Sequence, residues 1–172
     1  MAKSNSKRGK AYKPRPVRTD TMDMVKRHKS ALTPKEVAAI IDPTRASLDA
    51  LRMGQAVEQD WFHLCEAAGI ALDLSRIGIF SDDESIELFL KMYQACGEIG
   101  RRYNEIGRLV AKCPELVSIS DGIDHHELQL GYCSADELTR ACNSRKAQIM
   151  NARASRAEFI TLVDPAEEEV TA

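Results

Sequence analysis

The side chains with the greatest capacity for chemistry lie in one short stretch of the sequence. Two adjacent histidines stand among carboxylates, and imidazole and carboxylate groups together are typical metal ligands. These side chains are Asp121, Asp124, His125, His126 and Glu127. Adjacent histidines, however, point about 100° apart on a helix, whereas the i, i+4 histidines of helical zinc enzymes share one face. A polar helix face is therefore the favoured interpretation, and a metal-dependent enzyme at His125 and His126 is the third hypothesis for function.

Other catalytic arrangements are not indicated by the sequence. There is no Gly-x-Ser-x-Gly elbow and no P-loop, and Gly97 and Gly100 lie inside a helical pattern rather than after a strand. His28 and His63 stand alone, and a lone histidine in a helical protein is more often structural than catalytic. We therefore assign no catalytic residue, no metal ligand and no cofactor.

A basic segment at the N-terminus is the better candidate for binding a partner. Residues 1–18 carry seven positive charges and no acid, so the rest of the chain, whose total net charge is −2, sums to −9. Such a segment attracts phosphates or an acidic protein face through a salt-sensitive interaction without sequence specificity. The candidate partner-binding residues are Lys7, Arg8, Lys10, Tyr12, Lys13, Arg15 and Arg18. A terminus that only improves solubility is an equally weighted alternative.

A second interaction candidate is the segment 34–53, which is predicted to form two short helices. They would join at Asp42-Pro43, which repeats the start signal of the first helix. The apolar spacing resembles that of a helix-turn-helix, although Asp42-Pro43 occupies the turn where glycine is usual. Only Arg45 and Arg52 offer basic contacts in the second helix. Nucleic-acid binding through the tail and this helical pair is the second functional hypothesis.

Capping signals predict where the helices that carry these residues begin. Ser or Thr is followed three residues later by Glu at Thr33, Ser81 and Ser134. The longest predicted helix runs from Asp82 to Lys112, and its seam steps by three and four residues. The seam consists of Ile86, Phe89, Tyr93, Cys96, Gly100, Tyr103, Gly107 and Val110. We expect its glycines to allow a neighbouring helix to approach closely. A homodimer through this helix is an alternative to intramolecular packing.

Composition and periodicity together predict an all-α fold. Apolar residues make up 44% of the chain but aromatic residues only 5%, which favours helices over sheets. Helical periodicity also covers residues 57–77 and 134–152. Residues 114–132 are predicted to be one helix rather than a turn followed by a shorter helix. We expect an antiparallel helical bundle of about five to six helices.

Charge and proline content divide the chain into three parts. Residues 1–19 contain two prolines and no Leu, Ile or Phe, so they are predicted to be a basic, disordered tail. Residues 20–160 are the helical domain, and residues 161–172 are an acidic C-terminus that is expected to fray. The five cysteines lack any Cys-x-x-Cys spacing and are expected to be reduced and mostly buried. No stretch resembles a secretory signal or a membrane span, so we expect a cytoplasmic protein that does not bind membranes.

Several segments resemble a family of small uncharacterised proteins of tailed bacteriophages and proteobacterial prophages. The resemblance rests on Tyr-Lys-Pro-Arg-Pro-Val at 12–17, on residues 47–56, on Asp60 and on Asp-His-His-Glu-Leu-Gln-Leu at 124–130. It runs in order over most of the chain and implies a long helical body without enzymatic activity. The first functional hypothesis is a phage-encoded, non-enzymatic binding protein of regulatory or host-interaction type. It would bind a protein partner in the cytoplasm of the bacterial host cell.

Overall fold

The structure, a computed structural model, describes residues 29–154. Within this range the chain forms five helices, which are α2 (Pro34–Arg52), α3 (Glu58–Arg76), α4 (Asp83–Ile106), α5 (Cys113–Gly131) and α6 (Ala135–Ala154). The only strand-like pairing among these residues is an isolated bridge between Ala31 and Ser134. The all-α prediction is confirmed, including the single helix at 114–132. The predicted basic tail and the acidic C-terminus lie outside the described residues.

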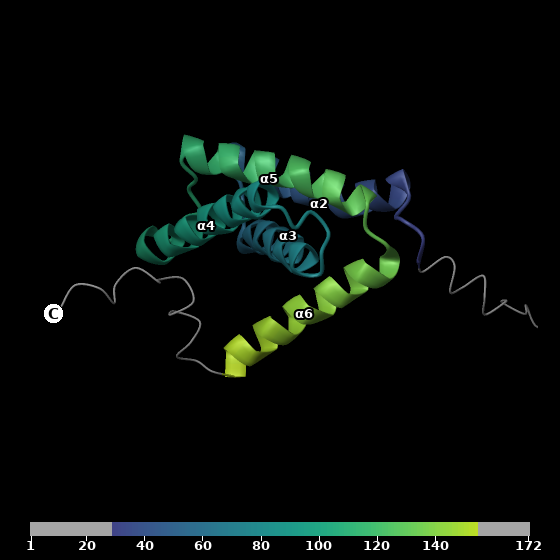
Figure 1. Ribbon diagram of the computed structural model, residues 1–172. Coiled ribbons are helices and arrows are strands. Elements are labelled where there is room, and N and C mark those ends of the chain that lie inside the picture. Colours follow the sequence, from purple (N-terminus) through teal and green to yellow (C-terminus); the bar gives the residue numbers. More distant parts are fainter. Residues whose placement is uncertain (1–28, 155–172) are drawn as a thin grey trace, which may run out of the picture.

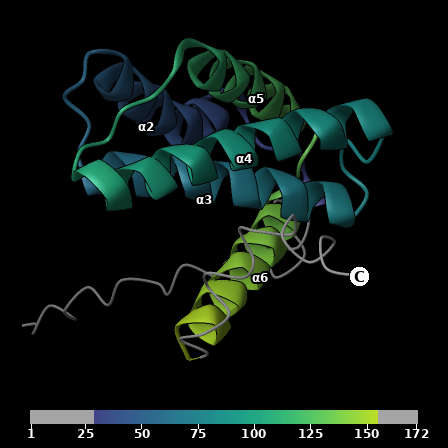
Figure 2. The same ribbon diagram turned by 90° about the vertical axis from the view of Figure 1, so that its left-hand side faces the viewer.

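Four of these helices form a two-layered bundle, and α6 packs on its outside. Figure 2 shows α2 and α5 side by side above α3 and α4, and each helix contacts the next in the order α2, α3, α4, α5 and back to α2. α6 packs on α3 and extends away from the other helices (Figures 1 and 2). The largest buried apolar side chains are Ile41, Leu64, Leu74, Phe89, Met92, Ile99, Ile119, Ile123 and Leu130. The core therefore lies inside the four-helix group.

Local capping interactions begin two helices where the sequence predicts them. The Thr33 backbone N–H donates to the Glu36 carboxylate at 2.9 Å, and the Glu36 backbone N–H donates to Thr33 Oγ1 at 3.3 Å. Ser134 and Glu137 form the same reciprocal pair ahead of α6. Each pair satisfies backbone donors that the first helical turn leaves without an internal partner.

The predicted start of the longest helix is one residue early, and its predicted cap and its predicted end are wrong. Asp82, not Ser81, caps the N-terminus of α4. At the other end, α4 stops at Ile106 rather than at Lys112, because Gly107 adopts the left-handed conformation with φ 69°. A left-handed glycine is a common helix stop, since it has no Cβ to oppose that backbone geometry. The last two positions of the predicted seam therefore lie outside the helix.

The predicted pair of helices at 34–53 is one continuous helix, α2, with Pro43 in its interior. The residues before and after the proline continue a single buried stripe. The apolar side chains of this stripe are Val37, Ile41, Leu48 and Leu51. A proline inside a helix costs about 3 kcal/mol, whereas each large buried side chain contributes roughly 1.5–3 kcal/mol. Burial of the stripe therefore outweighs the break, and the helix-turn-helix interpretation of this segment is wrong.

The seam of α4 is filled by the chain's own helices. A Cβ at Gly100 would lie 2.4 Å from Cζ2 of Trp61 in α3, and the Trp61 indole N–H donates to the Cys96 carbonyl at 2.8 Å. The Trp61 side chain, rather than the backbone of α3, therefore fills the space at Gly100, and at Gly107 no atom lies within 4 Å of a Cβ position. Phe89 and Cys96 of the same seam are also buried. The structure therefore does not support a homodimer through this seam.

Candidate functional site

Some of the residues predicted to bind or react lie outside the described residues, and others form hydrogen bonds within the bundle. The partner-binding residues of the tail, from Lys7 to Arg18, lie outside the described residues, and so does His28. His63 lies on α3, where its ring nitrogens are 3.2 Å from Ser47 Oγ and 2.9 Å from Gln59 Nε2. These contacts give His63 a structural role between α2 and α3.

Arg45 and Arg52 join α2 to α5. The Arg45 guanidinium lies 2.7 Å from an Asp124 carboxylate oxygen and 2.5 Å from one of Glu127. The hydrogen bond to Glu127, supported by Asp124, raises the pKa of Arg45. Arg52 donates to Ser120 Oγ at 3.1 Å. The two cations considered for nucleic-acid contact are therefore paired within the bundle.

The two adjacent histidines contact different partners. His126 is buried, and its Nδ1 lies 2.9 Å from Gln129 Oε1. His125 Nε2 lies 2.8 Å from Ser85 Oγ, and that hydroxyl donates to Asp82 at 2.7 Å. A serine hydroxyl has one proton, so here it accepts from the His125 N–H, and His125 does not act as its base. Within residues 29–154, no three His, Cys, Asp or Glu side chains are placed to hold a metal ion.

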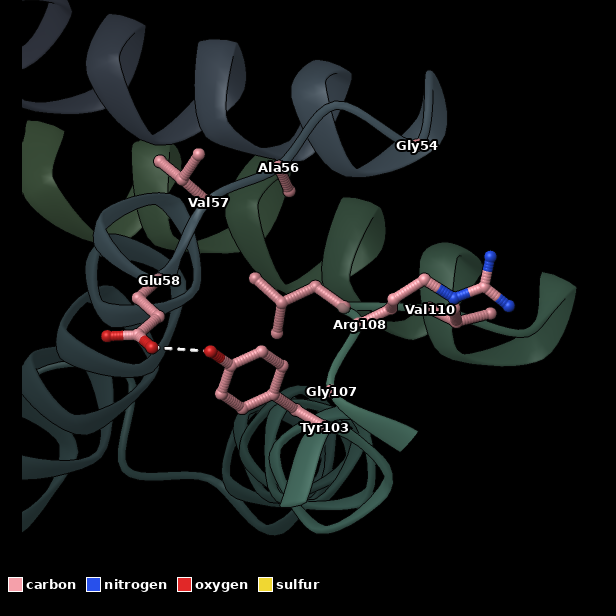
Figure 3. Close-up of a pocket in the computed structure, with 9 residues that line it drawn as sticks. Gly54, Ala56, Val57, Glu58, Tyr103, Gly107, Arg108 and Val110 are labelled. Atoms are coloured by element: carbon pink, nitrogen blue, oxygen red, sulfur yellow. Dashed lines mark hydrogen bonds between the residues drawn. The ribbon is translucent and has the colours of Figure 1, made fainter. Parts of the chain in front are cut away.

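A hollow at one end of the bundle is the candidate binding site, and we call it the end hollow. It has a volume of about 500 Å³ and lies between the α2–α3 turn, the end of α4 and the connection to α5 (Figure 3). Its lining residues are Gly54, Ala56, Val57, Glu58, Tyr103, Gly107, Arg108, Leu109 and Val110. Gly54 and Gly107 have φ angles of 68° and 69°. Both helices therefore end in tight left-handed turns beside the hollow.

One hydrogen-bonded polar pair faces the end hollow. The Tyr103 hydroxyl donates to the Glu58 carboxylate at 2.5 Å. This bond raises the pKa of Tyr103, because a negative acceptor favours the neutral phenol. Glu58 is the only carboxylate among the lining residues, and Figure 3 shows the Arg108 side chain extending away from it. The end hollow therefore has a negative group available to a ligand cation.

Exposed apolar side chains also lie on the segments that form the end hollow. Val57 and Val110 line the end hollow and are 60% and 40% exposed. Met53 and Ile106 precede lining residues in the chain and are 64% and 48% exposed. Leu109, in contrast, is buried. Large apolar side chains that stay exposed together are typical of surfaces that bind other proteins.

A partly buried ion pair holds the wall of the end hollow in place. The Arg102 guanidinium donates to both carboxylate oxygens of Glu115, at 3.1 and 2.6 Å, and to the Val110 carbonyl. Both side chains are largely shielded, with exposures of 14% and 13%, and the hydrogen bond to Glu115 raises the pKa of Arg102. The connection that carries Val110 is therefore fixed against α4 and α5, so the end hollow is preformed.

The sequence pattern does not predict the end hollow, because it places two of the lining residues on buried helix faces. Val57 was expected inside a helix but is the exposed N-cap of α3. Val110 was expected in the long seam but lies beyond the end of α4. The available signal was Gly107, since a glycine near the end of a periodic stretch also indicates a helix stop. If Gly107 is taken as the end of the helix, Val110 lies in the connection to the next helix.

Comparison of the chain with protein-family models, with curated proteins and with solved structures finds no match. In the part of the chain that the structure describes, no helix combines the length and apolar character needed to cross a membrane. The candidate site is an open hollow of mixed polar and apolar lining at one end of the helical bundle, with Glu58 and Arg108 as its charged side chains.

Proposed function

We propose that the chain is a non-enzymatic binding protein that acts by docking onto a protein partner through the end hollow. The observation that carries the proposal is the group of exposed apolar side chains on the segments that form the end hollow, together with the Glu58–Tyr103 pair. In this proposal the chain is a phage or prophage product of regulatory or host-interaction type, which works in the bacterial cytoplasm. The basic tail provides a second, electrostatic contact with the same partner.

The chemistry of the end hollow favours a particular kind of partner segment. Val57 and Val110 suit an aliphatic side chain, and the Glu58 carboxylate, from which the Arg108 side chain extends away, suits a lysine or arginine next to that side chain. Residues 29–154 carry 14 basic and 19 acidic side chains, a net charge of −5. This charge also favours the approach of a basic segment. We therefore propose that the occupant is a partner segment with an aliphatic residue beside a lysine or arginine.

Selection from a random peptide display library on the purified full chain tests this proposal. We expect enriched peptides to carry an aliphatic residue next to Lys or Arg. Substituting Val57→Asp or Val110→Asp should weaken their binding by about tenfold or more, because a charge then faces apolar ligand surface. Glu58→Gln should weaken binding only about two- to fivefold, since an exposed ion pair contributes little. Fluorescence anisotropy with the selected peptides measures these changes.

Val117→Asp is the matched control, since Val117 is 55% exposed but does not line the end hollow. It should leave peptide binding unchanged. Peptides whose binding is indifferent to Val57→Asp and Val110→Asp would contradict the proposal. A chain without residues 1–19 that binds these peptides much more tightly would show that its own tail fills the end hollow. That outcome would also contradict a foreign occupant.

Nucleic-acid binding through the tail is the second candidate function. The observation that favours it is the run of seven cations without an acid in residues 1–18. Because Arg45 and Arg52 are paired within the bundle, this candidate depends on the tail alone. Its affinity would be dominated by phosphate contacts and would depend strongly on salt.

A further inference from the structure

Helices α3 and α4 pack antiparallel in a register that can be followed through two contacts. Glu58 on α3 bonds to Tyr103 on α4, and one turn further along α3, Trp61 lies against Gly100. The next turn brings Cys65, four residues after Trp61, opposite Cys96, four residues before Gly100. The same register therefore places two cysteines directly across the helix interface.

The two thiols interact across this interface. A hydrogen bond with the Cys65 thiol, together with burial, raises the pKa of Cys96 well above its usual range. One turn away, the Trp61 side chain occupies the space that a Cβ of Gly100 would fill. The Trp61 indole also bonds to the Cys96 carbonyl at 2.8 Å. These two contacts of Trp61 hold α3 against α4 one turn from the cysteines, and the register places the two cysteines opposite each other, which is the arrangement that a disulfide needs.

We propose that Cys65 and Cys96 are an oxidation site that closes to a disulfide between α3 and α4. The inference does not depend on the proposed docking function. In a reducing compartment both groups remain thiols, and such pairs respond to oxidative challenge. Closure would covalently fix the spacing of the two helices that carry Glu58 and Tyr103.

The exposure of the two thiols sets the order of the chemical steps. Cys65 is half-buried and Cys96 is 1% exposed, so an external oxidant reaches Cys65 first. With oxidised glutathione, the Cys65 thiolate attacks one sulfur and releases a glutathione thiolate, which leaves a mixed disulfide. The Cys96 thiol then attacks the Cys65 sulfur, and its proton passes to the departing glutathione sulfur, which leaves as the second glutathione. Two protein thiols lose two electrons and two protons, and oxidised glutathione is reduced to two thiols.

The test uses the full chain with the substitutions Cys113→Ser and Cys142→Ser, which remove the two exposed cysteines. After incubation with oxidised glutathione, we expect a product lighter by two hydrogens that reverts with dithiothreitol. Non-reducing peptide mapping should join the peptide of Cys65 to that of Cys96. The oxidised chain should also melt roughly 5–10 °C higher, because the cross-link closes a loop of about 30 residues.

A further Cys65→Ser substitution in the same background should abolish both the cross-link and the melting shift. A stable glutathione adduct on Cys65, with Cys96 still open to alkylation after unfolding, would overturn the proposal. A cross-link that involves Cys133 instead would also overturn it. Cys65→Ser is preferred to a change at Cys96, since Cys65 is only half-buried and the folded state is easier to retain.

Discussion

His126 is buried without a charged partner, so its burial makes the stability of the bundle depend on pH. Desolvation lowers its pKa from 6.5 to about 4, and the bond with Gln129 opposes this shift only in part. Between these two values the unfolded chain binds a proton that the folded chain excludes. The free energy of unfolding therefore falls as pH decreases from 6.5 to about 4, and this histidine adds nothing further below that. The shift corresponds to roughly 3 kcal/mol.

His126→Asn tests this dependence, because the asparagine amide can still donate to Gln129. We expect the wild-type chain to lose roughly 3 kcal/mol more stability than the variant between pH 7 and pH 4. Urea unfolding followed by circular dichroism at several pH values measures the difference. His63→Asn is the matched control, since His63 is only half-buried, and it should keep the wild-type dependence. Parallel curves for the wild type and His126→Asn would refute the prediction.

At the residue scale, the sequence predicted that the adjacent histidines do not share one helix face, but it did not predict which groups they contact. Helical spacing alone indicates that His125 and His126 point in different directions. The Gln129 amide that fixes His126 bonds in turn to the carbonyls of Ala71 and Ile79, at 3.1 and 2.9 Å. These partners lie 58 and 50 residues away in the chain. Local spacing carries no information about such contacts.

At the element scale, Pro43 is the clearest local conflict with the fold. The proline has no N–H for the Ala39 carbonyl, and a proline inside a helix costs about 3 kcal/mol relative to alanine. Proline also restricts the unfolded chain, and this effect stabilises the folded state by about 0.4–1 kcal/mol. We therefore expect Pro43→Ala to raise the free energy of unfolding by about 1–2.5 kcal/mol. Urea denaturation measures the change.

Pro34→Ala provides the matched control within the same helix. Pro34 lies at the first position of α2, where its missing N–H would have no helical partner. This substitution should change the stability by less than about 1 kcal/mol and without a gain. An equal effect of the two substitutions, or a loss on Pro43→Ala, would mean that α2 is not continuous through position 43.

Helix starts were easier to predict than helix stops, for a physical reason. The starts at Thr33 and Ser134 depend on side chains three residues apart, so the signal is entirely local. The stop at Gly107 competes with a seam that continues to Val110 in the sequence, and periodicity cannot decide between them. At Pro43 the local signal itself was misleading. Asp42-Pro43 is a strong signal for a helix start, but α2 continues through it because the apolar stripe on both sides is buried.

At the scale of the whole molecule, the fold class was predictable but the end hollow was not. Helical periodicity recurs in every element, so the all-α bundle follows from the sequence alone. The end hollow instead combines residues 54–58 with residues 103–110. Two of its walls exist only because α2 and α4 end at the same end of the bundle. That coincidence depends on the exact lengths of both helices, which the sequence did not provide.

The basic tail gives the molecule its largest charge asymmetry, and this leads to a prediction about nucleic acid. We expect the full chain to bind short duplex DNA weakly, with an affinity that falls steeply as salt increases. The seven cations of residues 1–18 limit the slope of log affinity against log salt to about −6. Deletion of residues 1–18 should abolish this binding, as measured by fluorescence anisotropy between about 50 and 200 mM salt.

The body supplies the control for this measurement. Arg45→Gln combined with Arg52→Gln should leave the affinity and the salt slope unchanged, because both arginines are paired with side chains of the bundle. Binding that survives deletion of the tail but is lost in this double variant would show that α2 contacts nucleic acid. Loss of binding on deletion of the tail, together with a steep fall in affinity as salt increases, would show a purely electrostatic contact. The end hollow would then remain the candidate site for selecting a protein partner.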